Sequence, residues 1–210
     1  MKYTHILWDF NGTLLDDVEC GIKSINTLLA RRGLPIVESI EAYHEAFTFP
    51  ITKYYENVGF DFSVEPFSEI APEWIEENQI NIKSAPLFPD AIKILDVFKE
   101  QNIPQIIISA TKEDLLRGHI EDLNITSYFE DILGLDNINA ESKVCIAQNW
   151  LKEHPCANPV LIGDTVHDAE VAYAIGVDCI LIANGHQNRQ TLKKTGLPVY
   201  CSLGELLNYL

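Results

Sequence analysis

The 210-residue sequence is short of basic residues and of long apolar runs. It holds 15 Lys and Arg against 31 Asp and Glu, a formal net charge of −16. Nucleic acids and anionic membrane surfaces both favour basic proteins, so we expect neither as the main partner. No stretch reaches the roughly 18 consecutive apolar residues that a membrane-spanning helix needs. These deficits leave a small-molecule substrate as the open class of ligand.

Paired cysteines are also missing. The five cysteines are Cys20, Cys145, Cys156, Cys179 and Cys201. None belongs to a C-x-x-C pair, which argues against a zinc knuckle or a redox motif. Scattered thiols are typical of a reducing cytosol, and the first apolar run ends at once in Asp9, unlike a signal peptide. We therefore expect a cytoplasmic protein.

The composition that is present, 47% hydrophobic and 22% charged residues, is that of a globular chain. The spacing of its apolar residues differs between two parts of the chain. Residues 16–85 show helical spacing, as at Ile22, Ile25 and Leu29, and no comparable strand. The rest alternates short buried strands with amphipathic helices. We expect strands at 4–9, 104–109, 131–133, 159–163 and 179–182, and helices at 90–101, 113–123, 143–153, 168–175 and 203–209.

Apolar strands that alternate with helices predict a parallel sheet covered on both faces, a doubly wound, Rossmann-like α/β core. We expect a core domain of residues 1–15 and 86–210, interrupted by a helical domain of residues 16–85. Ligands of such sheets bind beyond the carboxyl ends of the strands. Asp9, Ser109 and Asp164 stand at three expected strand ends, so the active site is predicted there.

These residue types suit phosphoryl chemistry. An aspartate such as Asp9, exposed at a strand end, can attack phosphorus and form an acyl phosphate. Two anions that approach each other must be neutralised, which favours a Mg²⁺ ion held by Asp9 and Asp164. Ser109 and Lys143 offer a hydroxyl and a point charge for the phosphoryl oxygens. Gly12 lets the backbone pass close to the phosphate and present N–H groups.

The segment from Asp9 to Asp16 resembles the first motif of the haloacid dehalogenase superfamily of phosphohydrolases. Three further elements follow in that family's order. Ser109 is similar to the second motif, Lys143 to the third, and the segment from Gly163 to Asp168, with two aspartates four apart, to the fourth. The resemblance spans essentially the whole chain and points to the phosphoglycolate phosphatase branch, whose members insert a helical cap.

The resemblance implies a Mg²⁺-dependent hydrolase of a small phosphorylated metabolite that works through an aspartyl-phosphate. Asp9 would be the nucleophile, and Asp9, the Asn11 carbonyl and Asp164 the metal ligands. The phosphate-binding residues would be Gly12, Ser109, Ala110 and Lys143. The cap segment around Phe47–Tyr55 would close over the site and select the substrate. Asp168 is interpreted chiefly as a helix N-cap, and His167 as a bystander.

Asn11 departs from the family's pattern, which has an acid–base aspartate two residues after the nucleophile. A carboxamide cannot exchange a proton near neutral pH, and loss of such a group costs about 10²–10⁴ in rate. Three interpretations stay open: a slow phosphatase, a catalytically weak phosphate-binding or regulatory pseudo-phosphatase, and a phosphonate hydrolase. The last would need a cap lysine as a Schiff base, for which Lys23 and Lys53 are available. Asn11 as a laboratory substitution is a further interpretation.

Overall fold

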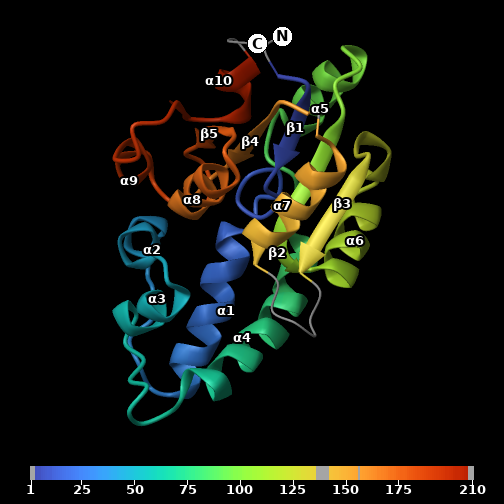
Figure 1. The fold of residues 1–210 in the computed structure, drawn as a ribbon. Coiled ribbons are helices and arrows are strands. Elements are labelled where there is room, and N and C mark those ends of the chain that lie inside the picture. The colour runs from blue at the N-terminus through green and yellow to red at the C-terminus, as the bar shows by residue number, and fades with distance from the viewer. Residues whose placement is uncertain (1–2, 136–141, 156, 208–210) are drawn as a thin grey trace. The chain divides into compact units, whose positions relative to one another are not determined.

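The computed structural model describes residues 3–135, 142–155 and 157–207. The chain divides into two compact units. The core unit comprises Met1–Leu15 and Leu87–Leu210, and the helical unit comprises Asp16–Pro86. The helical segment is therefore an insertion between the first strand of the core unit and the rest of it (Figure 1).

The core unit is built on a six-stranded sheet of parallel strands in the order β3-β2-β1-β4-β5-β6 (Figure 1). The strands are β1 (His5–Trp8), β2 (Gln105–Lys112), β3 (Asp131–Leu135), β4 (Pro159–Gly163), β5 (Asp178–Ile182) and β6 (Val199–Tyr200). The helices are α5 (Ala91–Glu100), α6 (Glu113–Asp122), η2 (Thr126–Tyr128), α7 (Lys143–Glu153), α8 (Val166–Ile175), α9 (Arg189–Lys193) and α10 (Leu203–Leu207). The strand order runs outward in both directions from β1 and β4, which confirms the predicted doubly wound α/β class.

Alternate residues of the central strand β1 face opposite layers of helices. Leu7 is fully buried in an apolar cluster that includes Trp150 of α7 and Val171 of α8. The next residue, Trp8, packs edge to face against Phe98 of α5, with ring centroids 6.0 Å apart. Helices therefore cover both faces of the sheet, and the two apolar layers hold the carboxyl ends of the strands in fixed register.

The largest differences between the elements found in the core unit and the expected ones concern β2, the pair β6 and α9, and α10. β2 continues to Lys112, past Ser109, because the ladder resumes after a register shift between Ile108 and Lys112. The segments β6 and α9 were not expected, since elements of two and five residues show no readable period. The closing helix α10 ends at Leu207, and the last two residues of the expected helix lie outside the described residues.

The helical unit has a core of its own. Its helices are α1 (Val18–Arg31), α2 (Ile40–Ala46), α3 (Ile51–Asn57), α4 (Phe67–Asn81) and η1 (Ile82–Ser84). Tyr54 and Tyr55 are each 3% exposed. Tyr54 packs against Phe47, with ring centroids 5.2 Å apart. Tyr54 and Tyr55 therefore belong to the interior of the helical unit, because burial of large apolar rings stabilises so small a bundle.

The thiols match the expectation of unpaired cysteines where the structure describes them. Cys20, Cys145, Cys179 and Cys201 are free, and Cys20 and Cys179 are buried. Cys156 lies outside the described residues.

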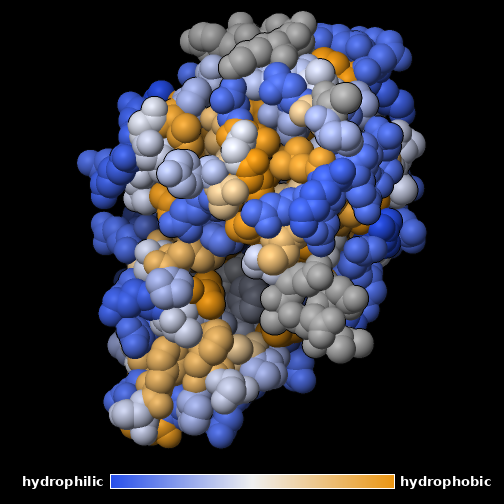
Figure 2. Space-filling view, in the orientation of Figure 1, coloured by the Kyte–Doolittle hydropathy of each residue, from blue (hydrophilic) through white to orange (hydrophobic). Residues whose placement is uncertain are grey.

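The surface carries separate apolar patches among hydrophilic side chains on the face drawn in Figure 2. Exposed large apolar residues include Ile36, Val64, Ile80 and Tyr173. Within the part of the chain that the structure describes, none of the helices combines the length and apolar character required to cross a bilayer.

Candidate active site

The carboxyl ends of three strands bring together the residues that the sequence singled out. Asp9 follows β1, Ser109 lies within β2 just after the regular part of its pairing with β3, and Asp164 follows β4. All three are buried. The Asp9 N–H donates to the Ile162 carbonyl at 2.9 Å, which extends the contact between β1 and β4 by one residue. The backbone of Asp9 is thereby fixed by the sheet itself.

Lys143 connects two carboxylates of this cluster. It is the first residue of α7, whose N-cap Ser142 accepts a hydrogen bond from the Cys145 N–H. The Lys143 Nζ donates to Asp9 Oδ1 at 2.5 Å and to Asp168 Oδ1 at 2.6 Å. Burial disfavours the charge on Lys143, but Asp168 and Asp9 outweigh it and raise its pKa. These two carboxylates therefore favour the charged form of Lys143 inside the site.

Asp168 stabilises the start of α8 and also binds Lys143 in the site. It is not the N-cap of α8, as was expected. The N-cap of α8 is Thr165, and Asp168 completes a capping box. Asp168 Oδ2 accepts from the Thr165 N–H at 3.0 Å and from its hydroxyl at 2.7 Å. Burial favours the neutral acid, but Lys143 and Thr165 hold the pKa of Asp168 below its ordinary value. Both Asp168 oxygens are thus engaged.

Thr13 and the backbone position Asp164. The His186 N–H donates to Asp164 Oδ2 at 2.6 Å. The buried Thr13 hydroxyl lies 3.2 Å from Asp164 Oδ1 and 3.3 Å from Asp9 Oδ2, so it can donate to either carboxylate. Burial raises the pKa of Asp9 to about 6 and that of Asp164 well above its ordinary value.

The donor set suits a divalent cation. One oxygen each from Asp9, Asp164 and Asp168 lies within 4.8 Å of the others. Three buried carboxylates carry more negative charge than one Lys143 neutralises, and hard oxygen ligands favour Mg²⁺. Asp168 is committed to Lys143 and Thr165, so Asp9 and Asp164 are the carboxylates that fit such an ion.

Asn11 and Ser109 are linked through Thr111. The Thr111 hydroxyl donates to Asn11 Oδ1 at 2.8 Å, and the Thr111 N–H donates to Ser109 Oγ at 3.1 Å. Because Ser109 accepts this bond, its own hydroxyl proton is available for a ligand oxygen. Ala110, the other predicted phosphate-binding residue of β2, is exposed.

The Gly12 N–H is engaged within its own loop. It donates to the Leu15 carbonyl at 3.0 Å and so is not directed at a phosphate. Gly12 has φ +72°, and a Cβ there would overlap the Asp164 carboxylate. The same Cβ would lie 2.6 Å from His186 Cδ2. Close packing against Asp164 and His186 therefore requires glycine at this position.

The loop after β5 is the part of the site that sequence reasoning missed. A Cβ on Gly185 would overlap both Asp164 Oδ2 and the Gly12 carbonyl. Gln187 is buried, and its Oε1 accepts from the Val166 N–H at 2.7 Å. The signal was present, because the rule that ligands lie beyond strand ends applies to β5 as it does to β1 and β4.

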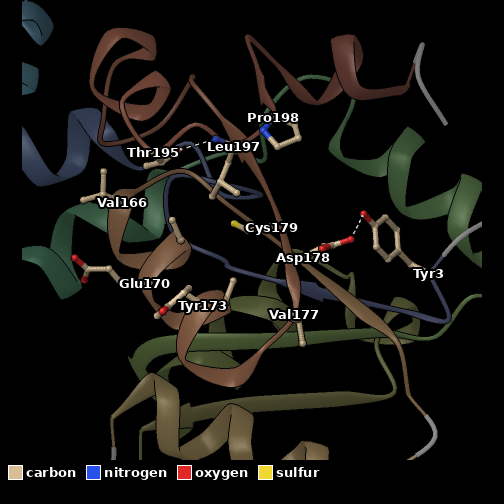
Figure 3. A pocket seen from close by; sticks show the side chains of 12 residues that line it. Tyr3, Val166, Glu170, Tyr173, Val177, Asp178, Cys179, Thr195, Leu197 and Pro198 are labelled. Atoms are coloured by element: carbon tan, nitrogen blue, oxygen red, sulfur yellow. Dashed lines mark hydrogen bonds between the residues drawn. The ribbon is translucent and has the colours of Figure 1, made fainter.

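A separate cavity of about 630 Å³ lies beside α8 and β5 (Figure 3). Tyr173 of α8 and Cys179 of β5 contribute to its lining, and the Tyr3 hydroxyl donates to Asp178 Oδ2 at 2.8 Å at its edge. None of the site carboxylates belongs to its lining. This cavity is therefore distinct in its lining from the carboxylate cluster.

An aspartate after the first strand, a buried lysine that opens a helix and an acidic pair after the fourth strand define a carboxylate-based hydrolase on a parallel α/β sheet. A sequence model of the haloacid dehalogenase-like hydrolases matches residues 6–182. The chain belongs to this family, which confirms the resemblance seen in its motifs.

Curated and solved relatives agree with the family. The phosphoglycolate phosphatase of Aquifex aeolicus is 24% identical over an alignment of 193 positions, which covers 86% of this chain and 85% of that protein. A haloacid dehalogenase-like family hydrolase from Streptococcus pneumoniae superposes with a TM-score of 0.82 at 22% identity, covering 99% and 98% of the two chains. The Protein Tyrosine Kinase A of Mycobacterium tuberculosis gives 0.82 at 20% identity, with the same coverage. Superpositions at such identities establish the fold alone.

The close packing around Gly185, in the loop that follows β5, leads to a testable prediction. We expect Gly185→Ala to lower the free energy of unfolding by about 1–3 kcal/mol, because the new Cβ must displace Asp164 or the Gly12 backbone. The control is Gly118→Ala in α6, where nothing lies within 4 Å of a Cβ. That change should stabilise the protein by about 0.5–1 kcal/mol. Urea titrations followed by circular dichroism measure both, and equal stability of Gly185→Ala and the unmodified protein would contradict the packing.

Proposed function

We propose that this chain is a Mg²⁺-dependent phosphatase that hydrolyses a small phosphorylated metabolite through an aspartyl-phosphate on Asp9. The observation that carries the proposal is the buried bridge from Asp9 through Lys143 to Asp168. It places the Asp9 carboxylate at the end of a strand, next to a cation that opposes the effect of burial on its charge and that can meet a phosphoryl group. The phosphatase name of the Aquifex relative supports the same class of substrate.

The first chemical step uses an oxygen of Asp9. It forms a bond to phosphorus while the bond from phosphorus to the leaving oxygen breaks, and the leaving group carries away that electron pair. The Lys143 ammonium has three N–H donors, of which two are used on carboxylates, so one remains for a phosphoryl oxygen. The Ser109 hydroxyl and the Ala110 N–H are the other proposed donors to the phosphoryl oxygens. Water then attacks the acyl phosphate, which releases inorganic phosphate and restores Asp9.

The metal site we propose comprises Asp9, Asp164 and the backbone carbonyl of Asn11. When bound, Mg²⁺ offsets the repulsion between the carboxylates and an incoming phosphate. The protein's own part is to keep these oxygens in place. Thr13 and the His186 N–H do so for Asp164, and the β1–β4 ladder does so for Asp9.

Asn11 determines how the leaving group receives its proton. Its amide Oδ1 accepts from Thr111, and a carboxamide has no acidic proton to give. In our proposal the proton comes from water, so esters with basic leaving groups react slowly. The helical unit acts in this proposal as the cap that selects the leaving group, and the reaction takes place in the cytoplasm.

The bond between Asn11 and Thr111 also favours a second candidate, a phosphate-binding or regulatory protein with little turnover. Such a protein would use the same Ser109 and Lys143 donors. Phosphonate hydrolysis is less favoured, because Lys53 is exposed and paired with Glu56 at 2.9 Å, and Lys23 is exposed as well. A Schiff-base lysine is normally activated by desolvation or by a neighbouring cation.

Phosphate release from a panel of phosphorylated metabolites, with and without Mg²⁺, tests the proposal. We expect Mg²⁺-dependent release from at least one small ester, and its loss in Asp9→Asn. In Asp164→Asn the Mg²⁺ concentration needed for half-maximal rate should rise at least about tenfold, because one charged ligand is lost. Asp178→Asn, in the separate cavity, is the matched control and should leave this concentration unchanged. Phosphate binding without release would support the regulatory candidate, and metal-independent release would contradict the metal assignment.

Restoring a carboxylate tests the role of Asn11. We expect Asn11→Asp to accelerate hydrolysis of alkyl esters by as much as about 10²-fold, since it supplies an acid–base group of nearly the same shape. Acyl phosphates should gain far less in the first step, because their leaving groups depart without a proton. Rates for the two substrate types at saturating Mg²⁺ give the comparison. A rate that is unchanged or lower for both would show that the site is shaped for another purpose.

A further inference from the structure

The pairing of β2 with β3 is interrupted beside the site by a bulge. The ladder runs regularly to Ile108 and resumes at Lys112, and the two partner residues in β3 are separated by Gly134 alone. Residues 109–111 of β2 therefore stand opposite one residue of β3. A bulge of this kind re-aims the side chains that it carries, and bulges are frequent next to active sites. This bulge carries Ser109, which we propose as a donor to the phosphoryl group.

Gly134 packs against the backbone at the end of the bulge. A Cβ at Gly134 would lie 2.7 Å from the Thr111 carbonyl oxygen, 2.5 Å from the Glu113 Cα and 2.7 Å from the Glu113 nitrogen. All three are backbone atoms, which cannot swing aside as a flexible side chain can. Arg117 of α6 holds the same region, because it donates to the Ile132 carbonyl at 2.7 Å and to the Glu113 carboxylate at 2.9 Å. The backbone can lie this close to β3 only because a glycine stands opposite.

Thr111 connects this packing to the site. Its backbone N–H donates to Ser109 Oγ at 3.1 Å, and its hydroxyl donates to Asn11 Oδ1 at 2.8 Å. The bond that Ser109 accepts engages a lone pair of its oxygen and thereby restricts where the hydroxyl proton can point. Ser109 is also only 2% exposed, so its side chain has little freedom to reorient if Thr111 moves. The direction of the Ser109 hydroxyl therefore depends on the position of Thr111.

We propose that Gly134 is a positioning residue of the phosphoryl site, which fixes Thr111 by admitting the bulge against β3 and thereby directs the Ser109 hydroxyl at a phosphoryl oxygen. The inference rests on the proposed function, because it takes Ser109 as a phosphoryl donor. Gly134 acts from β3, a strand at the edge of the sheet. A glycine inside a strand weakens that strand, so its presence in β3 needs a compensating reason, and the close approach of the bulge supplies one.

A double-mutant cycle distinguishes positioning from a merely structural role. We expect Ser109→Ala to lower kcat/KM about tenfold, the loss expected for one hydrogen bond to a charged group. Gly134→Ala should lower kcat/KM by a similar factor when Ser109 is present. In the Ser109→Ala background the same change should cost less than about twofold, because the group that Gly134 positions is then absent. A role independent of Ser109 would give the same factor in both backgrounds.

Thr111 provides a second route to the same test if Gly134→Ala does not fold. Thr111→Val keeps the shape of the side chain and removes the bond to Asn11, so it should lower kcat/KM about threefold to tenfold, again only when Ser109 is present. Thr111→Ser keeps the hydroxyl and should retain most of the activity. Ile132→Val, in the buried part of β3, is the matched control. It should lower the urea midpoint of unfolding and leave kcat/KM within about twofold.

Calorimetric binding of inorganic phosphate in the presence of Mg²⁺ repeats the cycle without turnover. The same pattern in the dissociation constants would support the role of Gly134 even if no ester is hydrolysed, and then the phosphatase proposal alone would fail. Equal losses from Gly134→Ala in both backgrounds, no loss in either, or full activity of Thr111→Val would overturn the role of Gly134 while the phosphatase function stands. An unmodified protein that neither hydrolyses an ester nor binds phosphate would overturn both.

Discussion

The ammonium of Lys143, buried between Asp9 and Asp168, is the interaction on which the active end of the core unit depends. It joins the end of β1, the start of α7 and the first turn of α8. Removing one partner of such a buried pair costs several kcal/mol, about 3–5, because a charge is left without compensation. The capping box of α8 and the N-cap of α7 place the two ends of the bridge, so local helix chemistry and site geometry depend on each other.

The buried carboxylates of the site destabilise the folded protein. Burial raises the pKa values of Asp9 and Asp164, which means that the folded protein disfavours the charged forms that its chemistry needs. The cation that we propose would relieve that cost and would link stability to metal concentration. The similar fold of a protein called Protein Tyrosine Kinase A shows why the function must be argued from these side chains rather than from the sheet.

Sequence reasoning predicted the core well because its strands are short, apolar and flanked by turns. The order of Asp9, Ser109, Lys143 and Asp164 along alternating strands and helices sufficed to place them at one edge of the sheet. The sequence did not predict which of the groups at that edge would form hydrogen bonds with one another. Periodicity shows which face is buried, but not that Thr111 would bind Asn11 or that the Gly12 N–H would turn inward to Leu15. Sequence reasoning did not find His186, because a short loop has no period. Nor could it decide the role of the aromatic residues around Phe47–Tyr55, because such side chains fit a bundle core as well as a substrate site.

The central claim is that Asp9 itself becomes phosphorylated, and mass spectrometry after a rapid acid quench tests it most directly. The protein is mixed with Mg²⁺ and a reactive phosphoryl donor such as acetyl phosphate, quenched, and digested at low pH. Because Asn11 provides no base for the second step, the account predicts that the peptide containing Asp9 gains the mass of one phosphoryl group. The gain should be absent in Asp9→Asn. Phosphate release with no labelled Asp9 at any quench time, or a label on another residue, would contradict the account.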